Sequence, residues 1–137
     1  MLLDRRVKKR ELLQTIAEYR TLKIPKSIKF KAPAGIVRAP LLDIGVGGCA
    51  LESPFNIPVK VILSIKIDPL LFAIGTSEKR RDPLEMTGRV SSSVCKAREH
   101  YRLGVSFVKI KKKDVGLIRR FMRSKERRRY LRFSFPR

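Results

Sequence analysis

The residues best suited to chemistry in this chain lie in one short segment, Asp43-Ile44-Gly45-Val46-Gly47-Gly48. A carboxylate accepts hydrogen bonds and carries charge, while glycine lets the backbone turn tightly or lets another molecule come close. Apolar, strand-like runs flank the segment on both sides. We therefore predict a tight turn between two strands, in which Asp43 either caps the turn or contacts a bound ligand.

The charge of the chain indicates what kind of ligand this would be. The 137 residues include 33 Lys and Arg against 12 Asp and Glu, a formal net charge of +21. A field of that sign attracts phosphate groups on nucleic acid, anionic lipid or a nucleotide. The alternative is a solvated basic surface with no such partner. The 43% of hydrophobic residues is enough for one folded domain with a modest core.

Catalytic and metal sites are not indicated. His100 is the only histidine and falls in an expected strand, and no residues form a Walker loop or a pair of carboxylates. Cys49 and Cys95 are far apart in sequence, so we predict two free, buried thiols. We expect a non-enzymatic protein without a cofactor. The sequence shows no signal-peptide pattern and no membrane-length apolar run, which predicts a cytoplasmic location.

Hydrophobic periodicity predicts a helix at each end of the chain. The first would begin at Asp4 and run to about Thr21, and would dock on the domain or on a second copy. Its apolar face would consist of Leu12, Leu13, Ile16 and Tyr19. The closing helix, from about 112 to 132, would begin with Asp114 as its cap and end in a basic segment. Its apolar patch would consist of Leu117, Ile118, Phe121 and Met122.

Between these helices the period changes to two, which predicts strands. The expected strands are 27–31, 35–44, 47–53 and 58–67, followed by a hairpin of 84–97 and 100–110. The inward sets would be Val59, Val61, Leu63, Ile65 and Ile67 in one strand and Tyr101, Leu103, Val105 and Phe107 in another. Several short antiparallel strands with a helix at each end predict a mainly β protein, folded as a small closed barrel.

The glycine turn resembles the signature turn of the PilZ family, which reads Asp or Asn, any residue, Ser, two more residues, then Gly. The Gly-Arg-Val at 88–90, the run Tyr-Arg-Leu-Gly-Val-Ser-Phe-Val at 101–108 and the closing basic helix are also similar to that family. The resemblance covers roughly residues 23–129. It implies a six-stranded antiparallel barrel over 23–112, preceded by a basic helix at 1–22 and followed by a basic helix and tail at 113–137.

The resemblance also implies cyclic di-GMP as the ligand. Asp43 would accept hydrogen bonds from a guanine, Gly45 and Gly48 would shape the turn, and arginines would bind guanine or phosphate. Gly45 departs from the family, because it stands where serine is usual.

The family's second half-site, Arg-x-x-x-Arg just before the first strand, is expected at Arg20 and Lys23, with lysine in the second place. Arg20 is one residue out of register, and lysine lacks the planar fork of arginine. Complete arginine patterns occur elsewhere. Arg5, Arg6 and Arg10 would lie a helix too early, and Arg127, Arg128 and Arg132 lie near the end of the chain. Arg128 and Arg132 would serve as the clamp by folding back or by reaching a neighbouring subunit.

Three functions follow. The first is a cyclic di-GMP-binding adaptor that signals to a protein partner, such as flagellar or other motility machinery. The second is a degenerate PilZ domain that does not bind the nucleotide and acts as a protein-interaction module, with homo-oligomers among the options. The third is a basic barrel that binds nucleic acid, although only 7% of residues are aromatic and no row of stacking rings is evident.

Overall fold

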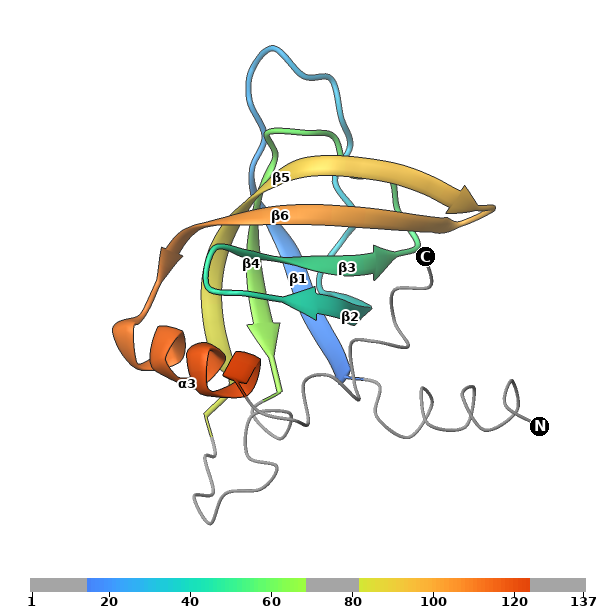
Figure 1. Cartoon of the computed structure of the whole chain (residues 1–137). Coiled ribbons are helices and arrows are strands. Elements are labelled where there is room, and N and C mark those ends of the chain that lie inside the picture. Colours follow the sequence, from blue (N-terminus) through green and yellow to red (C-terminus); the bar gives the residue numbers. More distant parts are fainter. Residues whose placement is uncertain (1–14, 69–81, 124–137) are drawn as a thin grey trace, which may run out of the picture.

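The computed structural model describes residues 15–68 and 82–123, which form a closed antiparallel barrel with one helix (Figure 1). The strands follow one another around the barrel in the order β1-β2-β3-β6-β5-β4. Their bounds are β1 Thr15–Lys23, β2 Val37–Ile44, β3 Gly48–Ser53, β4 Ile62–Ile67, β5 Leu84–Ala97 and β6 His100–Ile110. The prediction of a six-stranded antiparallel barrel is confirmed.

The predicted N-terminal helix is wrong from Thr15 onward, because these residues form strand β1. Ala17 and Tyr19 point into the barrel and are 0% and 1% exposed, while the next residue, Arg20, is exposed. Pairing with β2 on one side and β4 on the other satisfies the backbone of β1 and outweighs any helical preference of the sequence. The earlier part of the predicted helix, with Leu12 and Leu13, lies outside the described residues.

The strand predicted at 27–31 is also wrong, since this segment belongs to the connection between β1 and β2. Pro25 and Pro33 flank it, and proline cannot donate a hydrogen bond to a neighbouring strand. A turn closes instead, in which the amide of Ile28 donates to the carbonyl oxygen of Pro25 at 3.0 Å. Phe30 still packs against the core from this loop.

The strands with the clearest alternation are confirmed. In and just before β4, the inward side chains Val61, Leu63, Ile65 and Ile67 are each 0% exposed. Val59 was expected in the same set but is 44% exposed. The strand begins only at Ile62, because the chain turns at Lys60, which has a φ of 81°.

Helix α3, Lys112–Arg123, packs on the barrel through Ile118 and Phe121, which are buried. Asp114 lies within the first turn rather than at the cap, where its negative charge still favours the helix N-terminus. Met122 belongs to the predicted apolar patch but is 38% exposed. Figure 1 shows α3 below the connection from β2 to β3, so the helix closes the end of the barrel at which the glycine turn lies.

The hairpin of β5 and β6 extends past the barrel at its other end (Figure 1). Beyond Val90, β5 pairs only with β6, and most side chains there are exposed. Cys95 lies in this extension and is exposed, contrary to the prediction of two buried thiols, while Cys49 is buried in the core. No helix in the described part of the chain is long and apolar enough to cross a membrane.

Candidate ligand site at the turn between β2 and β3

The predicted glycine turn joins β2 to β3 and is fixed by backbone hydrogen bonds. The amide of Gly45 donates to the carbonyl oxygen of Gly48 at 2.8 Å, which closes the turn. The amide of Phe107 in β6 donates to the carbonyl oxygen of Gly47 at 2.9 Å, which ties the turn to the neighbouring strand. The turn is therefore a defined platform at one end of the barrel.

Asp43 lies half-buried at the start of this platform. Its Oδ1 accepts a hydrogen bond from the amide of Ile44 at 2.8 Å, so the carboxylate is oriented by the backbone of the turn itself. Burial, and secondly the charge of Asp43, raise the pKa of the Cys49 thiol to about 12. Cys49 is therefore protonated at neutral pH and unsuited to act as a nucleophile, which leaves the carboxylate as the polar group of interest here.

The three glycines of the turn have different surroundings, so each position tolerates a side chain to a different degree. A Cβ atom on Gly48 would overlap the carbonyl oxygen of Val105, because β3 and β6 pair closely at this point. A Cβ atom on Gly47 would meet nothing within 4 Å. Gly48 is thus required by the barrel rather than by a ligand, while the space beside Gly47 is open.

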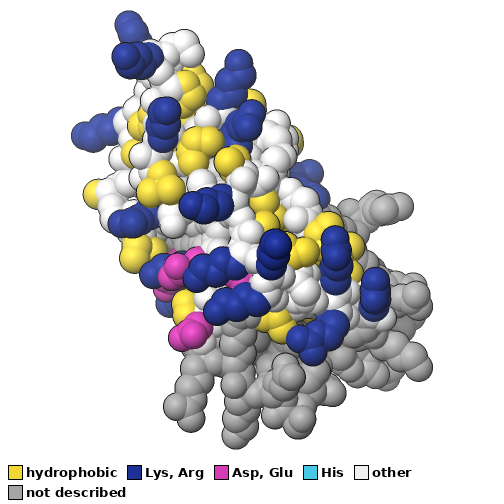
Figure 2. All heavy atoms as spheres, turned by 90° about the vertical axis from the view of Figure 1, so that its left-hand side faces the viewer, with side chains coloured by type: hydrophobic (Ala, Val, Ile, Leu, Met, Phe, Trp, Pro, Cys, Tyr) yellow, Lys and Arg dark blue, Asp and Glu magenta, His cyan; other side chains and the backbone are white. Residues whose placement is uncertain are grey.

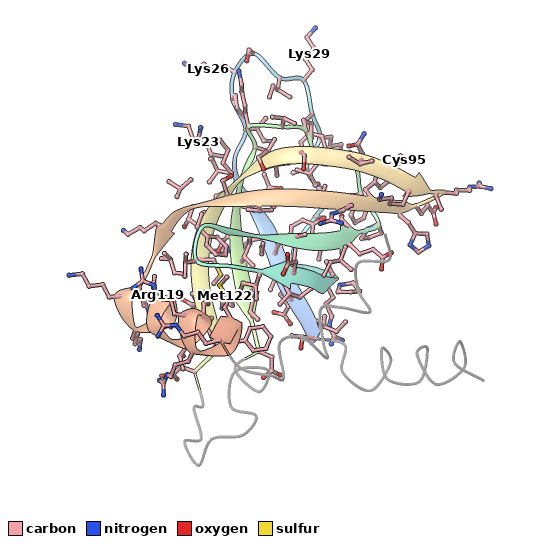
Figure 3. All side chains as sticks on the ribbon, in the orientation of Figure 1. Lys23, Lys26, Lys29, Cys95, Arg119 and Met122 are labelled. Carbon is pink, nitrogen blue, oxygen red and sulfur yellow. The ribbon has the colours of Figure 1, made fainter. Side chains whose placement is uncertain are left out.

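Gly45, at the position of the family's serine, faces helix α3. A Cβ atom built on Gly45 would lie 3.8 Å from both Sδ and Cε of Met122, an ordinary van der Waals distance. Figure 3 labels Met122 and Arg119 on α3, close to the turn. The end of α3 therefore covers the part of the turn where a serine hydroxyl would stand, and a small side chain fits there without displacing the helix.

Arg20 and Lys23 do not meet this turn. Thr15, the first residue of β1, pairs with Leu41 close to Asp43, and Lys23 is at the opposite end of the strand. The 9 residues of β1 span about 26 Å at roughly 3.3 Å per step. In the other direction around the barrel, strands β4, β5 and β6 separate Lys23 from Gly48. Both side chains are exposed, but they belong to a different part of the surface.

The same pairing changes the interpretation of the arginine cluster at Arg5, Arg6 and Arg10. The sequence analysis placed this cluster a helix too early, but the segment from Thr15 to Lys23 is a strand. The cluster therefore comes shortly before β1, at the strand end that pairs beside Asp43. Its own placement lies outside the described residues, as does that of Arg128 and Arg132.

The sequence analysis did not identify three residues near the turn, namely Arg89, Ser106 and Arg119. Gly48 pairs with Ser106 in β6, and Ser106 pairs with Arg89 in β5, so an exposed hydroxyl and an exposed guanidinium lie in line with the turn. Arg119 precedes Met122 by one helical turn and shares its side of α3. The Gly-Arg-Val segment at 88–90 is evident in the sequence. Only the strand register shows that its Arg89 pairs with Ser106, which in turn pairs with Gly48.

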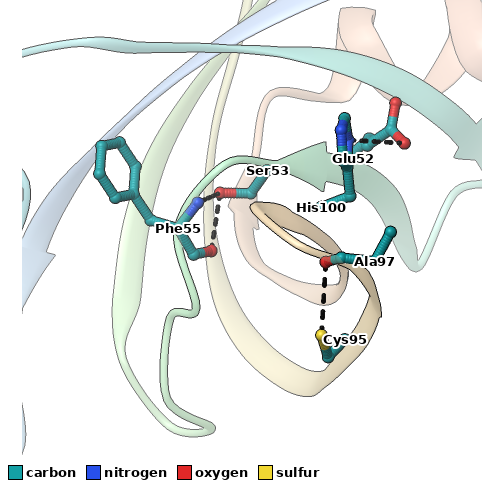
Figure 4. Close-up of polar contacts among 6 residues, drawn as sticks. All are labelled: Glu52, Ser53, Phe55, Cys95, Ala97 and His100. Atoms are coloured by element: carbon teal, nitrogen blue, oxygen red, sulfur yellow. Dashed lines mark hydrogen bonds and ion pairs between the residues drawn. The ribbon is translucent and has the colours of Figure 1, made fainter.

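The only histidine of the chain, His100, does not form a second candidate site with the residues that the structure describes. His100 is exposed on β6, and its Nδ1 is 3.6 Å from Oε1 of Glu52 (Figure 4). Within residues 15–68 and 82–123, no three His, Cys, Asp or Glu side chains gather in a way that would hold a metal ion.

Comparison with known proteins agrees with the resemblance noted in the sequence. No curated protein matches the chain. The model of the PilZ domain matches residues 5–124 of the 137, and so includes the arginine cluster before β1, the glycine turn and helix α3. PilZ domains are an adaptor family of the cyclic di-GMP-binding type. With most of its length matched and a six-stranded barrel as its fold, this chain belongs to the PilZ domain family.

Proposed function

We propose that this PilZ domain binds cyclic di-GMP at the turn between β2 and β3 and acts as a non-enzymatic signalling adaptor. The observation that carries the proposal is the pairing of Thr15 with Leu41. Thr15 begins β1 at the end of the barrel where Asp43 is oriented, and Arg10 comes five residues before Thr15 in the sequence. The proposal therefore assigns the clamp to Arg6 and Arg10. An anionic ligand at this end would meet a carboxylate for its base and guanidinium groups for its phosphates.

The chemistry of the ligand fits these groups. A guanine offers N1–H and N2–H donors, which a carboxylate such as Asp43 accepts, and O6 and N7 acceptors, which an arginine fork meets with two donors. Each phosphate can also be held by an arginine fork. Arg89 and Arg119 would add positive charge on the two sides of the turn. Ordering the basic segment before β1 on the ligand is how such a domain would signal to a protein partner without chemistry.

The test is calorimetric titration of the full chain with cyclic di-GMP at about 150 mM salt, with GTP and a short RNA as controls. We expect saturable binding that GTP and RNA do not match. Asp43→Ala and Arg10→Ala should each weaken it by roughly 10- to 100-fold, the range for a lost charged hydrogen bond. Arg20→Ala and Arg128→Ala are the matched controls. A loss confined to Arg128→Ala would move the clamp to the C-terminal cluster and contradict this proposal.

A second function is favoured by Gly45 and Met122. The turn lacks the family's serine, and the end of α3 occupies the adjoining space, as would suit a degenerate domain that binds only proteins. No heat with cyclic di-GMP from a folded protein would favour this function. Binding to RNA alone, unaffected by Asp43→Ala and steeply weakened by salt, would instead indicate a nucleic-acid-binding barrel.

A further inference from the structure

The outer surface of strands β1, β4, β5 and β6 combines basic and aliphatic side chains. We call it the mixed face. In one row across the strands Lys23 pairs with Ile62, and Ile62 with Arg89. A second row runs from Arg20 through β4 and β5 to Lys109. The mixed face consists of Arg20, Leu22, Lys23, Ile62, Arg89, Val108 and Lys109.

Two irregularities of the strand register build this face. The pairing of β1 with β4 passes over Leu22, and the pairing of β5 with β6 passes over Val108. A bulge of this kind interrupts the alternation of a strand and redirects side chains. Here it leaves two aliphatic–lysine pairs exposed, Leu22 with Lys23 and Val108 with Lys109. Leu22 is 49% exposed and Val108 is 54% exposed, so both aliphatic groups are available to a partner.

The charge of the mixed face is positive, with its acidic side chains at one end. Glu85 in β5 forms an exposed ion pair with Lys66 at 3.5 Å, and Glu18 in β1 pairs in register with the same lysine. Figure 2 shows basic side chains interleaved with hydrophobic ones over this side of the molecule, and acidic groups gathered near one edge. A partner must therefore offer negative charge and an apolar environment over the same area.

We propose that the mixed face docks the domain on an anionic lipid bilayer. Its lysines and arginines would contact lipid phosphates, while Leu22 and Val108 would enter the boundary between head groups and acyl chains. A bilayer offers both environments without a shaped partner surface. Nucleic acid fits less well, because bases stack on aromatic rings and this face presents aliphatic groups between its charges. The mixed face shares Arg89 with the proposed nucleotide site. Lys23 and Lys109 lie outside that site, so this inference does not depend on that function.

The test is co-sedimentation of the full chain with vesicles of equal parts phosphatidylglycerol and phosphatidylcholine, against pure phosphatidylcholine, at about 150 mM salt. The protein should bind only the anionic vesicles. Lys23→Glu with Lys109→Glu should weaken binding on the order of tenfold or more, and Leu22→Ser with Val108→Ser about fivefold. The control is Arg98→Glu at the exposed tip of the hairpin, which should change binding much less.

The chain is basic throughout, so the differences between variants decide the result. Equal losses for Arg98→Glu and the lysine variant would overturn the proposal, since charge alone would then account for binding. An unchanged affinity of the Leu22 and Val108 variant would overturn it too, because no aliphatic group would enter the bilayer. Equally tight RNA binding with the same losses would assign the face to nucleic acid. Circular dichroism and urea denaturation of each variant would show that the barrel is intact.

Discussion

The polar groups at the two ends of strand β3 differ in burial. The hydroxyl of Ser53 lies 2.6 Å from the hydroxyl of Tyr19. It also donates to the carbonyl oxygen of Phe55 at 2.9 Å and accepts from the amide of Phe55 at 3.0 Å (Figure 4). Ser53 is only 1% exposed, so its hydrogen-bonding capacity is used within the fold. At the Gly48 end, Asp43 is half-buried and the space beside Gly47 is open.

The difference supports the ligand site proposed at the Gly48 end of the strand. A buried hydroxyl with all its partners inside the protein stabilises the fold but offers nothing to a second molecule. The carboxylate of Asp43 is oriented by its own turn, beside glycines and a partly exposed helix end. A ligand bound there would leave the core intact.

The first prediction concerns Gly48 and Gly47. Gly48→Ala should lower the free energy of unfolding by about 1–3 kcal/mol, because the new methyl group must displace the backbone of Val105. Gly47→Ala, at the neighbouring position, should change the free energy of unfolding by less than about 1 kcal/mol, since its Cβ meets nothing within 4 Å. Urea denaturation of both variants measures this. Equal losses would mean that the turn, rather than the strand contact, requires glycine.

The second prediction concerns the pH dependence of stability. The pKa of Cys49 is raised from 9.0 to about 12 by burial and by Asp43, so the folded protein keeps a proton that the unfolded chain loses. The free energy of unfolding should therefore be unaffected by this group below pH 9. It should fall between pH 9 and about 12, with a slope of up to about 1.4 kcal/mol per pH unit.

Urea denaturation at several alkaline pH values measures this slope. Cys49→Ala should flatten it, whatever the variant does to the stability at pH 7. Cys95→Ala, at the exposed cysteine, is the control and should keep the wild-type slope. A slope that persists in Cys49→Ala would assign the alkaline loss to other groups.

The sequence predicts some elements of the barrel correctly and others not. Strand β4 and the β5–β6 hairpin were predicted because their alternation, as in Leu63 and Ile65, directly reflects burial of one face. The helix predicted through Tyr19 failed because pairing with distant strands outweighed the local helical spacing. Tyr19 points into the barrel together with Ala17, while Ile16, from the predicted apolar face, lies on the other side of the strand. The turn at Asp43 was predicted from its own local glycines.

The surroundings of that turn could not be predicted, for a physical reason. Gly48 meets Val105, and Arg89 comes into line with Gly48, only through the register of strands that are far apart in sequence. Register depends on the whole barrel, not on any local pattern. The error in the first strand had the largest consequence. It placed the start of the barrel at Lys23 instead of Thr15, and so placed the expected arginine site at Arg20 and Lys23.

The third prediction concerns the closed end of β3. Tyr19→Phe should lower the free energy of unfolding by about 1 kcal/mol, the usual net value of one buried hydrogen bond. Ser53→Ala should cost more, because the hydroxyl also bonds Phe55. A double-mutant cycle should give a coupling of about 1 kcal/mol between Tyr19 and Ser53. Neither variant should change cyclic di-GMP binding, and a loss of binding in a stably folded variant would contradict the separation of the two ends.

The last prediction concerns the open end and the smallest change in stability. Gly45→Ser restores the family's residue, and its Cβ would lie 3.8 Å from Met122, so stability should change by no more than about 0.5 kcal/mol. If the turn binds cyclic di-GMP, the added hydroxyl should strengthen binding about fivefold, equivalent to roughly 1 kcal/mol. Gly45→Ala is the matched control, because it adds the same Cβ without a donor. Equal affinities for the serine and alanine variants would mean that Gly45 does not face the ligand, and the contact would then have to be sought nearer Asp43.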